Sequence, residues 1–141
     1  MDLPSGLNDH SLAIMDMADQ IVIMAALEIT AIKNLRLFLE VADQLGYERS
    51  KLRIVMNRSD ATQGIRMGDV EGSIRRPIDG TIISDGRLAV LAVNRGVPFI
   101  LSNPESPLSR DVSKLAQTLI GGVTASDVEK PTNKRGIFAR R

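Results

Sequence analysis

The 141-residue sequence predicts an α/β fold in which helices flank a parallel β-sheet in three layers. Short runs rich in Ile and Val alternate along the chain with amphipathic helical segments, a pattern typical of βαβ units. The first apolar run, residues 20–25, is almost continuously hydrophobic, as in a strand that a parallel sheet covers on both faces. Because crossovers between parallel strands are right-handed, the helices between the strands complete the outer layers.

A long helix is expected directly after this first strand. The segment TAIKNLRLFLEVADQLG, residues 30–46, places apolar residues at steps of three and four, the period of an amphipathic helix. These residues are Ile32, Leu35, Leu39 and Ala42. Thr30 is the expected N-cap and Gly46 the expected C-terminal stop.

The middle of the chain predicts a second and a third strand with a helix between them. Residues 52–56 (LRIVM) form the second strand, and a short helix is expected over 67–76 because Pro77 ends it. Residues 80–83 form a short third strand.

The segment after the third strand is expected to be mainly helical. A helix over 87–94 stops at Gly96, and residues 97–101 are expected to be extended. The final helix is expected over 106–120, because Pro107 suits a first turn and two glycines follow the segment. Met15, Met17 and Met24 are interpreted as core or packing residues.

Composition excludes several classes of function. The chain has no cysteine, which excludes disulfides, thiolate metal sites and cysteine nucleophiles. Its single histidine, His10, follows Asn8 and Asp9 near an expected helix start, so we interpret it as solvent-facing and not catalytic. No apolar run reaches the roughly 18 residues of a transmembrane helix. We expect a cytoplasmic protein, with peripheral contact to the inner membrane as an option.

Charge is distributed unevenly along the chain. Residues 126–141 carry five Lys/Arg against two Asp/Glu, a sum of +3, so the rest of the chain carries −2 of the formal net charge of +1. We expect residues 123–141 to be a basic, disordered tail, which could alternatively make a weak contact with an anionic membrane surface. The slightly acidic body and the scarcity of aromatic residues argue against nucleic acid as a partner.

Six short motifs occur in the order found in MinD/ParA-type P-loop ATPases, and the chain resembles that family over nearly its whole length. They are residues 2–7 (DLPSGL), 18–23 (ADQIVI), 55–58 (VMNR), 82–85 (IISD), 94–98 (NRGVP) and 106–109 (SPLS). Their spacings, and residues 134–138 (KRGIF), most resemble the CpaE/TadZ branch, which serves Flp/Tad pilus assembly.

This resemblance implies that residues 1–122 are the C-terminal half of a P-loop NTPase, MinD-like domain. The opening segment, residues 1–6, is a loop signal with no strand before it, and the P-loop pattern G-x-x-x-x-G-K-[ST] does not occur in the sequence. The family binds ATP with Mg²⁺, and we expect this chain alone to bind neither and to have no turnover.

The family's site residues map onto the start and the middle of this chain. Asp2 matches a Walker B-type carboxylate, which acts on Mg²⁺ through a water, although at a chain end it is expected to be silent. Asn57 matches the asparagine that recognises adenine; the alternative is an asparagine that caps a turn. Arg58, Ser84 and Asp85 are the further nucleotide-binding candidates.

Two observations leave alternatives open at this site. Residues 57–60 (NRSD) also fit the N-K-x-D pattern of GTPases, but Arg58 stands in place of its lysine and the other motifs favour adenine. Ile83 replaces the family's proline, which affects the loop expected to face the base, and Asp85-Gly86 is equally compatible with a plain turn.

The first functional hypothesis is a fragment of a pilus-assembly ATPase that helps to localise the pilus machinery. The alternatives are a nucleotide-independent localisation scaffold of the same fold and a ParA-like partition protein. The resemblance places the P-loop strand beside residues 20–25, so that without it these residues form an exposed sheet edge. Such an edge predicts self-association. The family resemblance implies pilus-assembly proteins as further partners.

Overall fold

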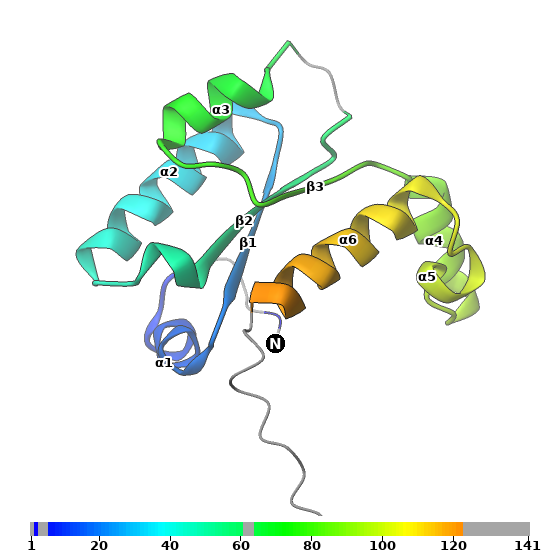
Figure 1. The fold of residues 1–141 in the computed structure, drawn as a ribbon, viewed down its shortest axis with the longest axis horizontal. Helices are drawn as coiled ribbons and strands as arrows, with labels where there is room; N and C mark the ends of the chain where they lie inside the picture. Colours follow the sequence, from blue (N-terminus) through cyan, green and yellow to red (C-terminus); the bar gives the residue numbers. More distant parts are fainter. Residues whose placement is uncertain (1, 3–5, 61–63, 123–141) are drawn as a thin grey trace, which may run out of the picture.

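Three parallel strands form the sheet in the computed structural model, which describes residues 2, 6–60 and 64–122. The strands β1 (Ile21–Ala26), β2 (Leu52–Asn57) and β3 (Gly80–Ile82) lie in the order β1-β2-β3 (Figure 1). The register pairs Ile21 with Leu52 at one end and Asn57 with both Ala26 and Ile82 at the other. The predicted parallel α/β sheet is therefore confirmed, with β2 as its central strand.

Two helices cover one face of this sheet. They are α2 (Ile29–Gln44) and α3 (Met67–Ile74) (Figure 1). Their apolar faces meet alternate residues of the strands. Ile54 and Met56 of β2 are fully buried in this cluster, together with Leu35 and Leu39 of α2. The three- and four-residue spacing read from the sequence thus faces the core as expected.

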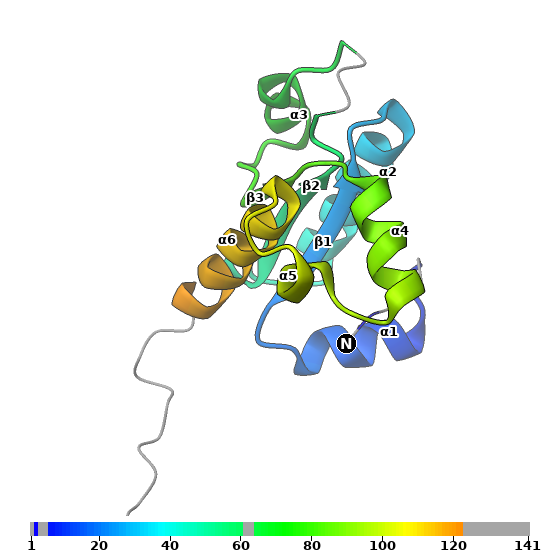
Figure 2. The ribbon, with the colours of Figure 1, turned by 90° about the vertical axis from the view of Figure 1, so that its right-hand side faces the viewer.

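Three helices from the second half of the chain lie on the other face of the sheet. These helices are α4 (Gly86–Arg95), α5 (Phe99–Ser102) and α6 (Pro107–Gly122), which Figure 2 shows on the side of the sheet toward the viewer. Val55 of β2 packs here with Leu88 and Leu108. A Cβ atom on Gly80 would lie 3.3 Å from Leu115 Cδ1, so the close approach of α6 to β3 depends on a residue without a side chain.

The first helix, α1 (Asp9–Met17), lies near the start of β1 (Figure 1). Its N-cap is Asn8, whose side chain accepts from Ser11 N at 2.9 Å while Ser11 Oγ accepts from Asn8 N at 2.8 Å. This reciprocal capping box fixes the start of the helix. His10 is exposed on it, as expected from the sequence.

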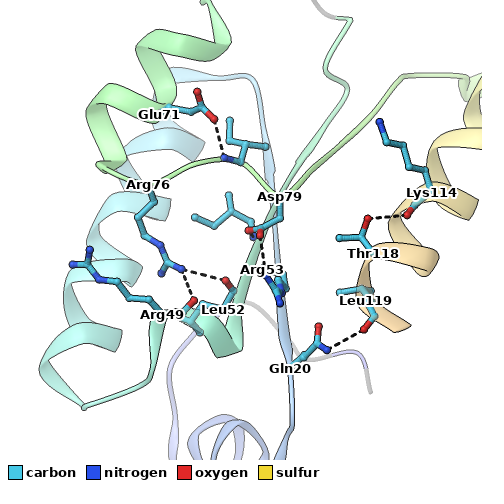
Figure 3. A network of polar contacts seen from close by, with 12 residues as sticks. Gln20, Arg49, Leu52, Arg53, Glu71, Arg76, Asp79, Lys114, Thr118 and Leu119 are labelled. Atoms are coloured by element: carbon cyan, nitrogen blue, oxygen red, sulfur yellow. Dashed lines mark hydrogen bonds and ion pairs between the residues drawn. The ribbon is translucent and has the colours of Figure 1, made fainter. Parts of the chain in front are cut away.

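Polar contacts hold the amino-terminal ends of the strands in place. Asp79 Oδ2 accepts from the backbone N–H of Ile54 at 2.7 Å, and its other oxygen pairs with Arg53 at 3.2 Å (Figure 3). Gln20 Nε2 donates to the carbonyl of Leu119 at 3.0 Å, which ties the end of α6 to the residue before β1. A single 3₁₀ turn, η1 (Arg49–Lys51), leads into β2.

Several local expectations were wrong. The helix expected to begin at Thr30 is capped instead at Glu28, whose carbonyl accepts from Ile32 N at 2.9 Å and closes the first turn. Residues 97–101 are not extended throughout, because the carbonyl of Pro98 accepts from Leu101 and Ser102 and starts α5. Met17 and Met24 are 86% and 50% exposed rather than packed, whereas Met15 is buried as expected.

The first strand is covered on one face and not on both. Among the described residues β1 pairs with β2 alone, which makes it an edge strand. On its less covered face the side chains of Val22 and Met24 are 39% and 50% exposed. Ile21 and Ile23, which point to the opposite face, pack against α2 instead. Among the described residues no helix is both long and apolar enough to span a bilayer. The tail expected over 123–141 lies outside the described residues.

Tyr47 joins α1 to the segment after α2. Its hydroxyl donates to Asp16 Oδ1 at 2.5 Å, and Lys51 Nζ donates to the Asp16 carbonyl at 3.1 Å. The hydrogen bond to Asp16, then burial and the charge of that carboxylate, raise the pKa of Tyr47. A raised pKa means that this contact stabilises the fold fully below the ordinary tyrosine pKa of about 10. The stabilisation is lost as pH rises through the folded pKa.

This contact predicts a late titration of Tyr47, which is the only tyrosine in a chain without tryptophan. In an ultraviolet titration the absorbance of tyrosinate should appear at a higher pH in the folded protein than in urea. The Asp16→Ala variant should lower the midpoint, because it removes the acceptor and its charge and leaves only the contribution of burial. Equal midpoints for the two folded proteins would show that the Tyr47–Asp16 contact does not form in solution.

Candidate functional site

Asn57 lies where the central strand ends. It is the last residue of β2, half-buried, and its backbone is paired on both sides within the sheet. Its Oδ1 accepts from the backbone N–H of Arg58 at 3.0 Å, and Arg58 adopts a left-handed conformation with φ of 54°. The chain therefore turns sharply after Asn57, which keeps this side chain at the carboxyl edge of the sheet, where α/β proteins bind ligands.

The loops after β2 and β3 are tied together at this edge. Asp60 Oδ1 accepts from the backbone N–H of Ser84 at 2.6 Å, and the backbone N–H of Ser59 donates to the carbonyl of Ile82 at 3.0 Å. The charge-assisted hydrogen bond that Asp60 accepts is the shorter of the two, as expected for a carboxylate acceptor. Ser84 is thus held beside the turn that follows Asn57.

Carboxylates also occupy the neighbouring backbone donors. Asp111 Oδ2 of α6 accepts from Ile83 N at 3.0 Å, and Asp85 Oδ1 accepts from Leu88 N at 2.9 Å as the N-cap of α4. The N–H groups of Ile83 and Ser84 are therefore already used within the protein. Contacts from this loop to a ligand would come from its carbonyl groups and side chains.

This geometry defines what the edge can offer a ligand. The Oδ1 of Asn57 has one lone pair left, and within the described residues its Nδ2 group has no acceptor. A carboxamide with a free donor and a free acceptor side can pair with a purine edge. Asp85 caps a helix, which is the turn role considered from the sequence, and Arg58 is exposed next to Asn57.

Asp60 and Asp111 are the residues that sequence reasoning missed. Asp60 was considered only as the last residue of an N-K-x-D pattern, whereas its carboxylate binds a backbone N–H 24 residues away along the chain. Asp111 lies in the middle of an amphipathic helix, where an acidic residue is ordinary. A sequence signal for Asp111 would have required knowing that α6 packs against β3.

Asp2 is exposed and stands apart from the other carboxylates. Within the described ranges, no group of three His, Asp or Glu residues could hold a metal ion. Magnesium is usually bound by one or two carboxylates together with substrate phosphates, and Asp2 alone would supply at most one ligand. The role of Asp2 therefore stays a prediction.

A long open groove of about 950 Å³ runs beside the free edge of β1. All six residues of β1 line it, together with Met15 of α1, Phe38 and Val41 of α2, and Asp2. Its lining is mostly apolar, and one side of it is the unpaired backbone of an edge strand. A further strand with an apolar flank would fit such a surface.

Comparison with known proteins shows which folds this architecture resembles. No protein-family model matches the chain. The chain is 22% identical to an uncharacterised ATP-binding protein of Methanocaldococcus jannaschii, across 100% of this chain and 55% of that protein. Among solved structures, it resembles a ParA family ATPase from Chlorobium tepidum with a TM-score of 0.72 and 19% identity, over 81% of this chain and 47% of that one.

Two structures from Aquifex aeolicus give a similar result. A chain of the MinC:MinD cell division protein complex matches with a TM-score of 0.70 and 19% identity, over 96% of this chain and 51% of that one. The MinD cell division protein matches with a TM-score of 0.66 and 21% identity, over 82% and 49%. The fold is thus that of ParA- and MinD-like P-loop NTPases, and the chain spans about half the length of the proteins it matches.

Proposed function

We propose that this chain is the base-binding half of an ATPase-type domain, in which Asn57 recognises the adenine of ATP. The observation that carries this proposal is the position of Asn57 at the carboxyl end of the central strand, beside a loop held by Asp60. Similarity to an ATP-binding protein along the whole chain supports adenine as the base. Arg58, Ser84 and Asp85 would line the same site.

The phosphates and Mg²⁺ would be held by other residues of the complete domain. The sequence lacks the P-loop pattern, and Asp2 would act on the metal only through a water. Asn57 and the loop after β3 would therefore orient the base, while hydrolysis would depend on groups that this chain does not supply.

For the biological role we propose localisation of the Flp/Tad pilus machinery, on the strength of the motif spacings and residues 134–138. A ParA-like partition protein is compatible with the same fold. A nucleotide-independent scaffold is favoured by one specific observation, which is that backbone donors of the base-facing loop are already occupied by Asp60 and Asp111.

The test uses the intact protein, as its gene encodes it. Calorimetric titration with ATP and with GTP, each with Mg²⁺, separates these functions. The proposal expects ATP to bind more tightly than GTP. Absence of binding by either nucleotide would favour the scaffold, and preference for GTP would favour the N-K-x-D interpretation of residues 57–60.

The free edge of β1 predicts that the 141-residue chain self-associates. Val22 and Met24 present an apolar surface next to unpaired backbone groups, and lysine side chains on edge strands oppose such pairing. In light scattering at high concentration, the chain should exceed its monomer mass of 15.4 kDa. The double variant Val22→Lys/Met24→Lys should be monomeric.

The control is Val93→Lys, which changes an 80% exposed valine on α4 and should leave the association unchanged. A monodisperse monomer for the unaltered chain would contradict self-association through this edge. Loss of association in the Val93→Lys variant as well would place the interface elsewhere.

A further inference from the structure

A second, smaller cavity lies at the opposite end of the central strand from Asn57. It has a volume of about 160 Å³ and opens between α2, the turn η1 and the end of α3. Charged side chains dominate its lining: Arg36, Glu40, Asp43, Arg49, Arg75 and Arg76. Because η1 precedes β2 and Asn57 ends it, this cavity is separate from the proposed nucleotide site.

The lining carries an excess of positive charge. Four guanidinium groups face two carboxylates, which leaves two positive charges. Both carboxylates are already paired, Glu40 with Arg36 at 2.9 Å and Asp43 with Arg49 at 2.9 Å. Within the described residues, Arg75 and Arg76 have no ion-pair partner, so they hold the uncompensated charge.

Arg76 is fixed in place with part of its hydrogen-bonding capacity unused. Its Nη2 donates to the carbonyls of Arg49 at 2.6 Å and Leu52 at 3.2 Å, as Figure 3 shows. Its Nη1 is buried and has no acceptor among the described residues. Burial and then the charge of Arg49 lower the pKa of Arg76, and the charges of Asp43 and Asp79 offset part of this shift.

We propose that this cavity binds a phosphate group, with Arg75 as its principal donor, Arg49 at its side and Arg76 as a fixed positive charge. A guanidinium fork matches the oxygens of a phosphate, and a dianion would balance the two excess charges. The cavity is smaller than the roughly 300–1,000 Å³ typical of small-molecule sites, so it would take one phosphate group and not a nucleotide. The hydroxyl of Ser73, which also lines the cavity, is a further donor.

The test titrates the 141-residue chain with inorganic phosphate by calorimetry, with chloride holding the ionic strength constant. Binding should be saturable. The variant Arg75→Gly should weaken it about tenfold, because one charge-assisted contact is lost. Glycine suits this position, since Arg75 has a φ of 54° and the left-handed conformation costs glycine nothing. The variant therefore keeps the fold, which a thermal melt without phosphate would verify.

Arg49→Gln gives a second, independent variant and should also weaken binding. The matched control is Arg110→Ala, which should leave phosphate affinity unchanged. It removes an exposed arginine of α6 that pairs with Glu105 at 2.8 Å. Adenosine has no phosphate, so it should not compete with inorganic phosphate for this cavity. The phosphate proposal therefore stands or fails independently of the nucleotide proposal. Glycerol phosphate in place of inorganic phosphate identifies whether a phosphate ester or the free ion fits.

Three results would overturn the proposal. The first is no binding of phosphate or glycerol phosphate beyond that of chloride. The second is an affinity that Arg75→Gly and Arg49→Gln leave unchanged. The third is an equal loss in the Arg110→Ala control, which would mean general screening of a basic surface.

Discussion

An Ile54→Asp variant is expected to be unfolded at 25 °C. Ile54 is 0% exposed in the central strand, where it packs between β1 and the helices α2 and α3. Burying an ionised carboxylate without a partner costs several kcal/mol. That is comparable with the whole stability of a domain, about 5–15 kcal/mol. Far-ultraviolet circular dichroism should show loss of the native spectrum.

The matched control is Ile29→Asp. Ile29 is 71% exposed and opens α2, where a negative charge near the helix N-terminus is favourable by about 0.3–1 kcal/mol. Its urea unfolding midpoint should equal or exceed that of the unaltered chain. Similar midpoints for the two aspartate variants would contradict the burial of β2 described above.

An Asn57→Ala variant of the intact protein is expected to bind ATP roughly 5- to 150-fold more weakly. The carboxamide would make two hydrogen bonds to adenine, each of about 0.5–1.5 kcal/mol, and 1.4 kcal/mol corresponds to a factor of ten. Preference for ATP over GTP should fall with it, because the same group reads the purine edge.

The control for this variant is Asn94→Ala, an exposed asparagine in the last turn of α4. It removes the same chemical group away from the carboxyl edge of β2, so ATP affinity should not change. Equal affinities for the Asn57→Ala variant and the unaltered protein would make Asn57 a turn residue, in accord with its bond to the Arg58 N–H.

The order and type of most elements follow from local pattern. The spacing of Ile32, Leu35 and Leu39 predicts the buried face of α2, and all three residues are in the core. β2 could be placed for the same reason, since the apolar residues 54–56 suit a strand with Ile54 buried on one face and Val55 on the other. Such signals are local because the period of the backbone fixes which residues share a face.

The segment at Pro98 shows where local pattern fails. Residues 97–101 include β-branched and aromatic residues that favour a strand, but residues 99–102 form the four-residue helix α5. There the carbonyl of Pro98 is satisfied by two local N–H groups, and Phe99 packs against the cluster around Leu108. Tertiary packing therefore outweighs propensity over such a short segment.

The candidate site also has features that local sequence predicts and features that it does not. Asn57 could be proposed from its motif, because the end of a strand is a local feature. The bond between Asp60 and Ser84, and the clustering of Arg49 with Arg75 and Arg76, join residues far apart in the sequence. No periodicity encodes such contacts, so only the folded chain brings these groups together.

The most direct test of the central claim is hydrogen–deuterium exchange of the intact protein with and without saturating ADP and Mg²⁺. The account predicts slower exchange at backbone N–H groups of residues 58–60 and 83–86, since the base would lie against both loops. This protection should be lost in the Asn57→Ala variant at the same ADP concentration. Protection confined to other parts of the chain, or none in these two loops, would contradict an adenine site at the carboxyl edge of β2 and β3.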